Sequence, residues 1–345
     1  MFIRNAWYAA ALSGELPPAA LFPRTILSER VVMYRTTDHQ IVALADRCAH
    51  RQVPLSRGRL LGDQVQCWYH GLRYDTTGKC VEIPSQTTVP RTACVRKFPA
   101  VEKYGMIWLW MGDAQKADEA AIPNHWVCSA RELAGALSYC SVNCNYLFGI
   151  DNILDISHAA FVHQKTLGSI DVAERPPEVL ISDGEVRVRR KLFKEKTPPL
   201  YANILKMEYM DRVQEVIYWP IGNTRVDTTA HAAGDPASKV LRVYTTTIFT
   251  PATELSSHIF VGMHRDFDIG NTRLTEIITK EVFSTVLEDK DVAESLQGNW
   301  DPAAPMIQIK LDGPAIAARQ MLDRIHAGRS IAAADGPAVS AVVTQ

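Results

Sequence analysis

The sequence lacks both a strong charge of one sign and a long hydrophobic run. Its formal net charge is -1 over 345 residues, which provides no broad field to attract nucleic acid or anionic lipid. Nowhere do apolar residues continue for the roughly 20 positions that a transmembrane helix requires. Residues 1–8 also lack the basic segment and apolar core of a signal peptide. We therefore expect a cytoplasmic protein whose partners are small molecules or other proteins, with no binding to nucleic acid or membrane.

Cysteine is scarce, which limits the part that disulfide bonds can play. The seven cysteines are odd in number and widely spaced, so a disulfide scaffold is not expected, although a subset could bind metal. Hydrophobic residues make up 47% of the chain and charged residues 22%, as in ordinary soluble globular proteins. A chain of this length usually forms two domains.

Residues 1–112 have the pattern of a small all-β unit. Short stretches rich in Val, Ile and aromatic residues predict strands, and turn signals such as residues 75–78 separate them. The predicted strands are residues 30–35, 40–44, 65–68, 72–74 and 105–111.

Two Cys–His pairs fall in loops beside these strands. Cys48 and His50 are followed, after an interval of 16 residues, by Cys67 and His70. A zinc finger groups its two cysteines before its two histidines, so the interleaved order argues against that motif, but spacing leaves a zinc site of another type open. The interleaving favours a [2Fe–2S] cluster with both cysteines on one iron and both histidines on the other.

Residues 151–163 predict an amphipathic helix that carries a carboxylate and two imidazoles between its apolar faces. At about 100° per residue, Asp155 and His158 share a face, whereas His158 and His163 point about 140° apart. If both histidines bind one metal ion, the helix must widen, kink or end between them. The spacing alone leaves open a core helix with hydrogen-bonded histidines and an exposed aspartate.

Residues 272–297 predict a second helix with one acidic residue on its apolar stripe. Asp289 lies on that stripe, so its carboxylate faces the core and needs a cation or several hydrogen-bond donors. Glu288 and Asp291 are turned about 100° and about 160° away and have the pattern of solvated surface. Pairing of Asp289 with Lys or Arg is the alternative. The stripe consists of Leu274, Ile277, Ile278, Val282, Val286, Ala293 and Leu296.

The pattern of residues 113–126, with acids, alanines and Pro123, predicts the crossing between two domains. Beyond the first helix, residues 178–267 are rich in β signals. We predict one domain at residues 1–115, a second at residues 116–330, and a flexible tail at residues 331–345, where the sequence is small and polar.

Together these motifs resemble the oxygenase (alpha) components of Rieske non-haem iron oxygenases. The two Cys–His pairs match the Rieske loops, and Asn152, Asp155, His158 and His163 match the segment that binds mononuclear iron in that family. The likeness covers nearly the whole chain. It is greatest for the short oxygenases typified by vanillate O-demethylase, toluenesulfonate methyl-monooxygenase and dicamba O-demethylase. Further similar runs lie at residues 4–8, 101–110 and 262–267.

The resemblance implies an α+β chain, with an N-terminal all-β Rieske [2Fe–2S] domain followed by a helix-grip catalytic domain of antiparallel sheet plus helices. It also implies roles for single residues. The family's cluster ligands correspond to Cys48, His50, Cys67 and His70, and its Fe(II) ligands, a 2-His-1-carboxylate set, to His158, His163 and Asp289.

The resemblance gives Asp155 a separate task, and Asn152 joins it as a catalytic candidate. In the family, this aspartate links a cluster histidine of one subunit to an iron histidine of the next. We therefore expect its carboxylate to accept hydrogen bonds from His70 and His158 and to carry electrons between the metals. Such a path implies a closed head-to-tail ring, most simply a homotrimer.

The implied function is that of the terminal oxygenase in a multi-component system. It would use O2 to monooxygenate a methoxy or methyl group on an aromatic substrate, an aromatic acid in this branch, for example by O-demethylation with release of formaldehyde. No G-x-G-x-x-G motif occurs, so we expect a separate NAD(P)H-dependent reductase of flavin or ferredoxin type. Two rival functions are ring cis-dihydroxylation and electron transfer by a Rieske protein without oxygenase activity.

The sequence does not single out residues that contact the substrate. A carboxylate or sulfonate would need a hydrogen-bond donor, and the candidates are Arg242, Lys280, His231 and the threonines Thr245, Thr246 and Thr247.

Overall fold

The computed structural model describes residues 2–182, 184–235, 238 and 240–328. It divides the chain into two compact units, Met1–Ile122 with Thr250–Glu254, and Pro123–Phe249 with Leu255–Gln345. The domain boundaries expected at residues 115 and 330 stay predictions, and the expected tail at residues 331–345 lies outside the described residues.

The first unit is built from strands, which confirms the predicted all-β class. Its strands form a sheet of three in the order β1-β11-β10 and two sheets of four in the orders β2-β3-β4-β9 and β5-β6-β7-β8. Each of the five predicted strands occurs, whereas the others are too short or too irregular in pattern to be recognised. The strands are β1 (Trp7–Leu12), β2 (Phe22–Ile26), β3 (Glu29–Arg35), β4 (Ile41–Ala45), β5 (Arg59–Leu61), β6 (Gln64–Gln66), β7 (Arg73–Tyr74), β8 (Cys80–Glu82), β9 (Lys97–Phe98), β10 (Ala100–Lys103) and β11 (Met106–Trp110).

The second unit is organised around one sheet of seven strands in the order β12-β18-β17-β16-β15-β14-β13. Side chains alternate in burial on these strands, since Val186 and Val243 are buried while Arg187 and Arg242 beside them are more exposed. The strands are β12 (Ala134–Val142), β13 (Glu178–Ser182), β14 (Glu185–Lys196), β15 (Tyr209–Trp219), β16 (Asn223–Ala232), β17 (Leu241–Thr253) and β18 (Ser256–Arg265).

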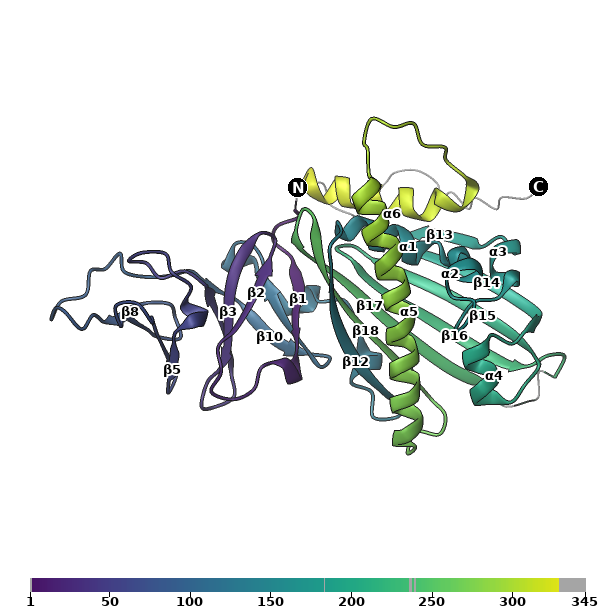
Figure 1. Ribbon diagram of the computed structural model, residues 1–345, viewed down its shortest axis with the longest axis horizontal. Coiled ribbons are helices and arrows are strands. Elements are labelled where there is room, and N and C mark those ends of the chain that lie inside the picture. Colours follow the sequence, from purple (N-terminus) through teal and green to yellow (C-terminus); the bar gives the residue numbers. More distant parts are fainter. Residues whose placement is uncertain (1, 183, 236–237, 239, 329–345) are drawn as a thin grey trace. The chain divides into compact units, whose positions relative to one another are not determined.

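A long helix, α5, runs across one face of this sheet (Figure 1). It packs against β12 and β18, and α1 packs against α5, α6 and β15. The side chain of Asn271 caps α5 by accepting a hydrogen bond from the backbone N–H of Leu274 at 2.9 Å. The large antiparallel sheet with helices confirms the predicted class of the second unit. The helices are α1 (Tyr146–Leu154), α2 (Ala159–Val162), α3 (Ile170–Glu174), α4 (Pro199–Leu205), α5 (Thr272–Asn299) and α6 (Gly313–His326).

Candidate active site

The two Cys–His loops of the first unit have the same backbone hydrogen-bond pattern. The N–H of each cysteine donates to the carbonyl five residues later, Cys48 to Val53 at 2.9 Å and Cys67 to Leu72 at 2.8 Å. One loop follows β4 and the other joins β6 to β7. The repetition of one loop geometry predicts that the two loops act as a pair around a single group.

Each of these loops also contains a residue with left-handed backbone geometry. Gln52 has φ 58° and Gly71 has φ 73°. Both donate their N–H to the carbonyl of the loop's own cysteine, at 2.9 Å and 3.1 Å. Glycine adopts this conformation without a steric cost, whereas glutamine does not.

The donor atoms in these loops are arranged by type. Cys48 and Cys67 are buried, whereas His50 and His70 are exposed, with ring centroids 4.6 Å apart. Burial raises the pKa of the Cys67 thiol, and its contact with Cys48 raises it further. Two sulfurs on the inside and two imidazoles on the outside suit an iron–sulfur cluster with mixed ligands.

The hydroxyl of Tyr74 contacts the thiol of Cys48. This hydroxyl lies 3.2 Å from Cys48 Sγ and accepts a hydrogen bond from the N–H of Ala49 at 3.0 Å. A thiolate has no proton to donate, so with Cys48 ionised the Tyr74 hydroxyl is the donor in this pair. A thiolate at Cys48 would therefore receive a hydrogen bond from a residue that the sequence did not single out.

In the second unit, the predicted helical segment is interrupted at Asp155, before both of its histidines. Helix α1 ends at Leu154, a 3-10 turn covers Ile156–His158, and α2 begins at Ala159 and ends before His163. Asp155 leaves the helical conformation with φ -117° and ψ 83°, and its carboxylate accepts a hydrogen bond from Ser157 N at 3.1 Å. Asp155 makes this break by capping the next turn. The spacing required a change between His158 and His163, and there the 3-10 turn gives way to α2, which ends at Val162.

The break brings His158 and His163 to Asp289 on α5. The Nε2 atoms of His158 and His163 lie 3.2 Å and 3.1 Å from Asp289 Oδ1. One ligand atom from each of the three residues lies within 4.8 Å of the others. Adjacent ligands about 2.1 Å from one metal ion are separated by about 3 Å when they meet at right angles. The three side chains therefore fit a mononuclear metal ion.

Three polar contacts orient this triad. Asn152 Nδ2 donates to Asp289 Oδ1 at 3.2 Å, and His158 Nδ1 lies 2.6 Å from the backbone carbonyl of Asp155. Glu288 Oε2 lies 2.7 Å from His163 Nδ1. The expectation that Glu288 is solvated surface is therefore wrong, because His163 approaches α5 on that side. Asp291 is exposed, as expected.

Opposite charges in the triad shift its pKa values. Burial acts to raise the pKa of Asp289, but hydrogen bonds from His158 and His163 lower it to about 2. Burial acts to lower the pKa of His163, but Asp289 and Glu288 raise it above its ordinary value. The carboxylate is therefore ionised near neutral pH and ready to bind a cation.

The carboxylate of Asp155 does not contact His158 as expected. In the described part of the chain the carboxylate contacts Ser157 N and Arg190 Nη2, the latter at 3.5 Å from Oδ1. The cap of the 3-10 turn draws the carboxylate away from the ring, which the carbonyl of the same residue contacts instead. The guanidinium of Arg190 is buried, and burial lowers its pKa.

A cavity of about 100 Å³ adjoins the triad. Aliphatic side chains make up most of its wall, including Ile153, Val261 and Val282, and polar groups occur on the sheet. The polar residues other than the triad are Tyr201, Gln214, Thr228, Thr245, Thr247 and Thr285.

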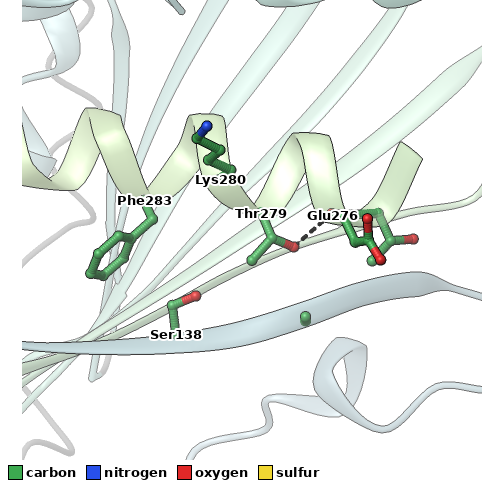
Figure 2. Close-up of a pocket in the computed structure, with 7 residues that line it drawn as sticks. Ser138, Glu276, Thr279, Lys280 and Phe283 are labelled. Atoms are coloured by element: carbon green, nitrogen blue, oxygen red, sulfur yellow. Dashed lines mark hydrogen bonds between the residues drawn. The ribbon is translucent and has the colours of Figure 1, made fainter. Parts of the chain in front are cut away.

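Only two of the six candidate anion donors, Thr245 and Thr247, line this cavity. Thr246 Oγ1 instead accepts from Cys128 Sγ at 3.5 Å, and Arg242 pairs with Asp266 at 3.1 Å. Lys280 borders a separate open groove, in which Thr279 and Phe283 of α5 face Ser138 of β12 (Figure 2).

Two protein-family models match the chain. One, the Rieske [2Fe-2S] domain, matches residues 6–99, and the other, the vanillate O-demethylase oxygenase C-terminal domain, matches residues 142–328, more than half of the chain. The chain belongs to the Rieske non-haem iron oxygenases. The second match argues against the rival function of a Rieske protein that only transfers electrons.

Individual relatives of this oxygenase agree with the family. The iron-sulfur subunit of the toluene-4-sulfonate monooxygenase system of Comamonas testosteroni is 36% identical, with 94% of this chain and 97% of that protein covered. A crystal structure of dicamba monooxygenase bound to 3,6-dichlorosalicylic acid matches with a TM-score of 0.88 at 30% identity, covering 94% and 98% of the chains. Another, with non-haem iron and dicamba, has a TM-score of 0.80 at 30% identity with the same coverage.

These findings establish the class of enzyme. This oxygenase is the terminal oxygenase component of a Rieske monooxygenase system, and its cofactors are a [2Fe–2S] cluster and a mononuclear non-haem iron. Its electrons come from a separate reductase, and its substrate is aromatic. Of the helices that the structure describes, none has the length and apolar character needed to cross a membrane.

Proposed function

We propose a ligand set for each cofactor. The cluster ligands are Cys48, His50, Cys67 and His70, and the iron ligands are His158, His163 and Asp289. Support comes from the paired loops with buried sulfurs and exposed imidazoles, and from triad atoms spaced as adjacent ligands of one ion. When bound, the iron would activate dioxygen while leaving coordination positions open towards the cavity.

We propose that this oxygenase monooxygenates a methoxy or methyl carbon on an aromatic ring. The observation that carries this proposal is the largely aliphatic cavity that ends on the triad. Its walls would hold the ring, place one C–H bond at the iron and exclude water. One oxygen atom of O2 enters the substrate, and the other leaves as water with two electrons and two protons. Hydroxylation of a methoxy carbon gives a hemiacetal, which separates into a phenol and formaldehyde.

The polar residues of the cavity would bind the substituents of the ring. Gln214 and Thr228 are directly opposite on β15 and β16, and Thr228 hydrogen-bonds to the hydroxyl of Tyr201. Arg212 also bonds to Tyr201, and its charge is balanced by Glu195 at 2.5 Å. No Lys or Arg is among the described residues that line the cavity. A substrate carboxylate would therefore be held by hydroxyl and amide donors.

The test is a screen of methoxylated and methylated benzoates, and of their uncharged analogues, for reductase-dependent release of formaldehyde. We expect formaldehyde and a phenol in equal amounts from a methoxylated substrate. With ¹⁸O2, the formaldehyde from a methoxylated substrate, or the alcohol from a methylated one, should carry one labelled atom. A cis-diol carrying two labelled atoms would instead establish the ring dioxygenase. The same assay with Asp289→Ala should give no product, whereas Asp291→Ala should retain activity.

We also propose that electrons pass between subunits of a head-to-tail homotrimer. His50 and His70 are exposed beside the exposed aromatic rings of Trp68 and Tyr69. On the catalytic unit, the Asp155 side chain is 26% exposed, and the nearby Phe161 is 65% exposed. These surfaces are suited to burial against a second copy. The reductase that feeds the ring would oxidise NAD(P)H through flavin or ferredoxin centres, and a cytoplasmic location stays a prediction.

A further inference from the structure

A second, smaller cavity of about 40 Å³ also adjoins Asp289. It lies within the second unit, between α1, α5 and the sheet, and we call it the rear chamber. Residues common to the rear chamber and the catalytic cavity form a wall between the two spaces. These shared residues are Ile153, Thr247, Val286 and Asp289.

The rest of the rear chamber is mainly apolar. It is lined by aliphatic and aromatic side chains such as Val142, Phe249, Ile259 and Ala293. Gly149 completes this wall, because a Cβ at that position would lie 2.4 Å from Cε1 of Phe249. The close approach of α1 to Phe249 thus depends on glycine and fixes one side of the chamber.

Three polar side chains of the rear chamber are engaged by other protein groups. Ser257 Oγ donates to the carbonyl of Cys144 at 2.8 Å, and Lys290 Nζ pairs with Glu294. The amide of Asn152 donates to Asp289. A buried water needs two to four polar partners, whereas an apolar cavity without them stays dry and takes up small apolar molecules.

We propose that the rear chamber is a binding site for dioxygen, the second substrate of the reaction. This inference rests on the proposed iron ligands only for its location beside Asp289. Dioxygen is apolar and diatomic, and a space of about 40 Å³ admits it, whereas a substituted benzene ring does not fit. The aromatic substrate fills the catalytic cavity. Dioxygen bound in the rear chamber would therefore lie beside the iron site without competing with that substrate for the same space.

Xenon provides a readout that does not depend on turnover. Crystals of the metal-loaded enzyme are placed under xenon pressure, and we expect a xenon atom between Val142, Phe249 and Ala293. The variant Ala293→Leu fills this space, and leucine is compatible with the middle of α5. We expect it to exclude xenon. Val142→Ala enlarges the chamber and should raise xenon occupancy, which provides a second test if Ala293→Leu folds poorly.

Kinetics then relate the rear chamber to the reaction. For Ala293→Leu we expect a rise of about threefold or more in the KM for dioxygen, with little change in the KM for the aromatic substrate or in iron content. The matched control is Val172→Leu, which fills the catalytic cavity alone and should raise the KM for the aromatic substrate instead.

An unchanged KM for dioxygen in Ala293→Leu would overturn the proposal. So would ordered water, without xenon, in the wild-type chamber. If xenon binds as expected but no aromatic compound is turned over, the proposed reaction fails and the chamber stands.

Discussion

His163 contacts a carboxylate through each of its two ring nitrogens. Asp289 lies at Nε2 and Glu288 at Nδ1, although these acids are adjacent on α5. An imidazole that binds metal through Nε2 keeps its proton on Nδ1. A carboxylate that accepts a hydrogen bond from Nδ1–H makes the ring a stronger ligand to the metal. Glu288 is thus placed to fix the tautomer and the orientation of His163.

We expect Glu288→Gln to weaken the binding of mononuclear iron by about 10- to 100-fold, because the amide keeps an acceptor but loses the charge. Competition with a chelator measures this affinity, while the visible absorbance of the cluster reports that the first unit is intact. Asp291→Asn, an exposed change on the same helix, is the matched control. Equal iron affinity in Glu288→Gln and the wild type would show that the contact does not support the metal.

Two buried histidines of the second unit should make its stability depend on pH. Burial lowers the pKa of His125 and of His264 to about 4, whereas an unfolded histidine titrates near pH 6.5. Between about pH 6.5 and pH 4 the unfolded chain binds protons that the folded chain does not, so the free energy of unfolding falls as pH falls. His264→Met should reduce this slope by about 1.4 kcal/mol per pH unit, as measured by urea unfolding. An identical slope in this variant would contradict the assignment.

Asp155 determines the form of the element that carries both histidines. It ends α1 and caps the following 3-10 turn, and its carbonyl contacts His158. The sequence predicted that a break was needed between His158 and His163, because no regular helix aims both at one ion. It did not predict the partners of the Asp155 carboxylate, since Arg190 comes from β14, a strand that local spacing cannot place.

We expect Asp155→Asn to leave both metal sites filled and to slow electron transfer between them by orders of magnitude. The amide keeps an acceptor for Ser157 N and leaves the backbone carbonyl on His158, but it removes the charge that would bind a cluster histidine of the neighbouring subunit. A single-turnover experiment follows reoxidation of the reduced cluster after O2 and substrate are added, with iron content measured beforehand. Wild-type rates in the fully loaded variant would show that Asp155 is no bridge. A purely structural role would instead cost about 1–3 kcal/mol of stability.

At the scale of the whole molecule, the sequence predicted the fold class and the triad more completely than the cavity. Paired loops and an acid on an apolar stripe are local patterns, and they identified Cys48, His70 and Asp289. The cavity wall is assembled from several helices and strands, so its members depend on the register of the sheet. Tyr201 and Gln214 carry no local signal for this reason.

The proposed ring predicts that two inactive subunits restore activity together. His70→Ala disables the cluster of one subunit type, and Asp289→Ala disables the iron of the other. In a head-to-tail ring, a cluster in an Asp289→Ala subunit can reduce the iron of a neighbouring His70→Ala subunit. Co-expression of the two variants should therefore recover a substantial part of wild-type turnover, on the order of a quarter.

Separate expression of each variant gives the baseline for this experiment, and sedimentation of the mixture verifies that assembly is normal. Turnover no higher than this baseline in a correctly assembled mixture would place the electron path within one subunit.

The residues with left-handed backbone conformation in the two Cys–His loops imply that one loop opens more readily than the other. Gln52 is exposed and has a conformation that costs a non-glycine residue about 1–2 kcal/mol, whereas Gly71 holds the same position without that cost. Gln52→Gly should therefore slow the bleaching of the cluster by a chelator, and Gly71→Ala should hasten it, since its Cβ would also lie 3.0 Å from Pro84 Cγ. In the ageing wild-type enzyme, the loop of Cys48 and His50 should open first, so alkylation should reach Cys48 before Cys67.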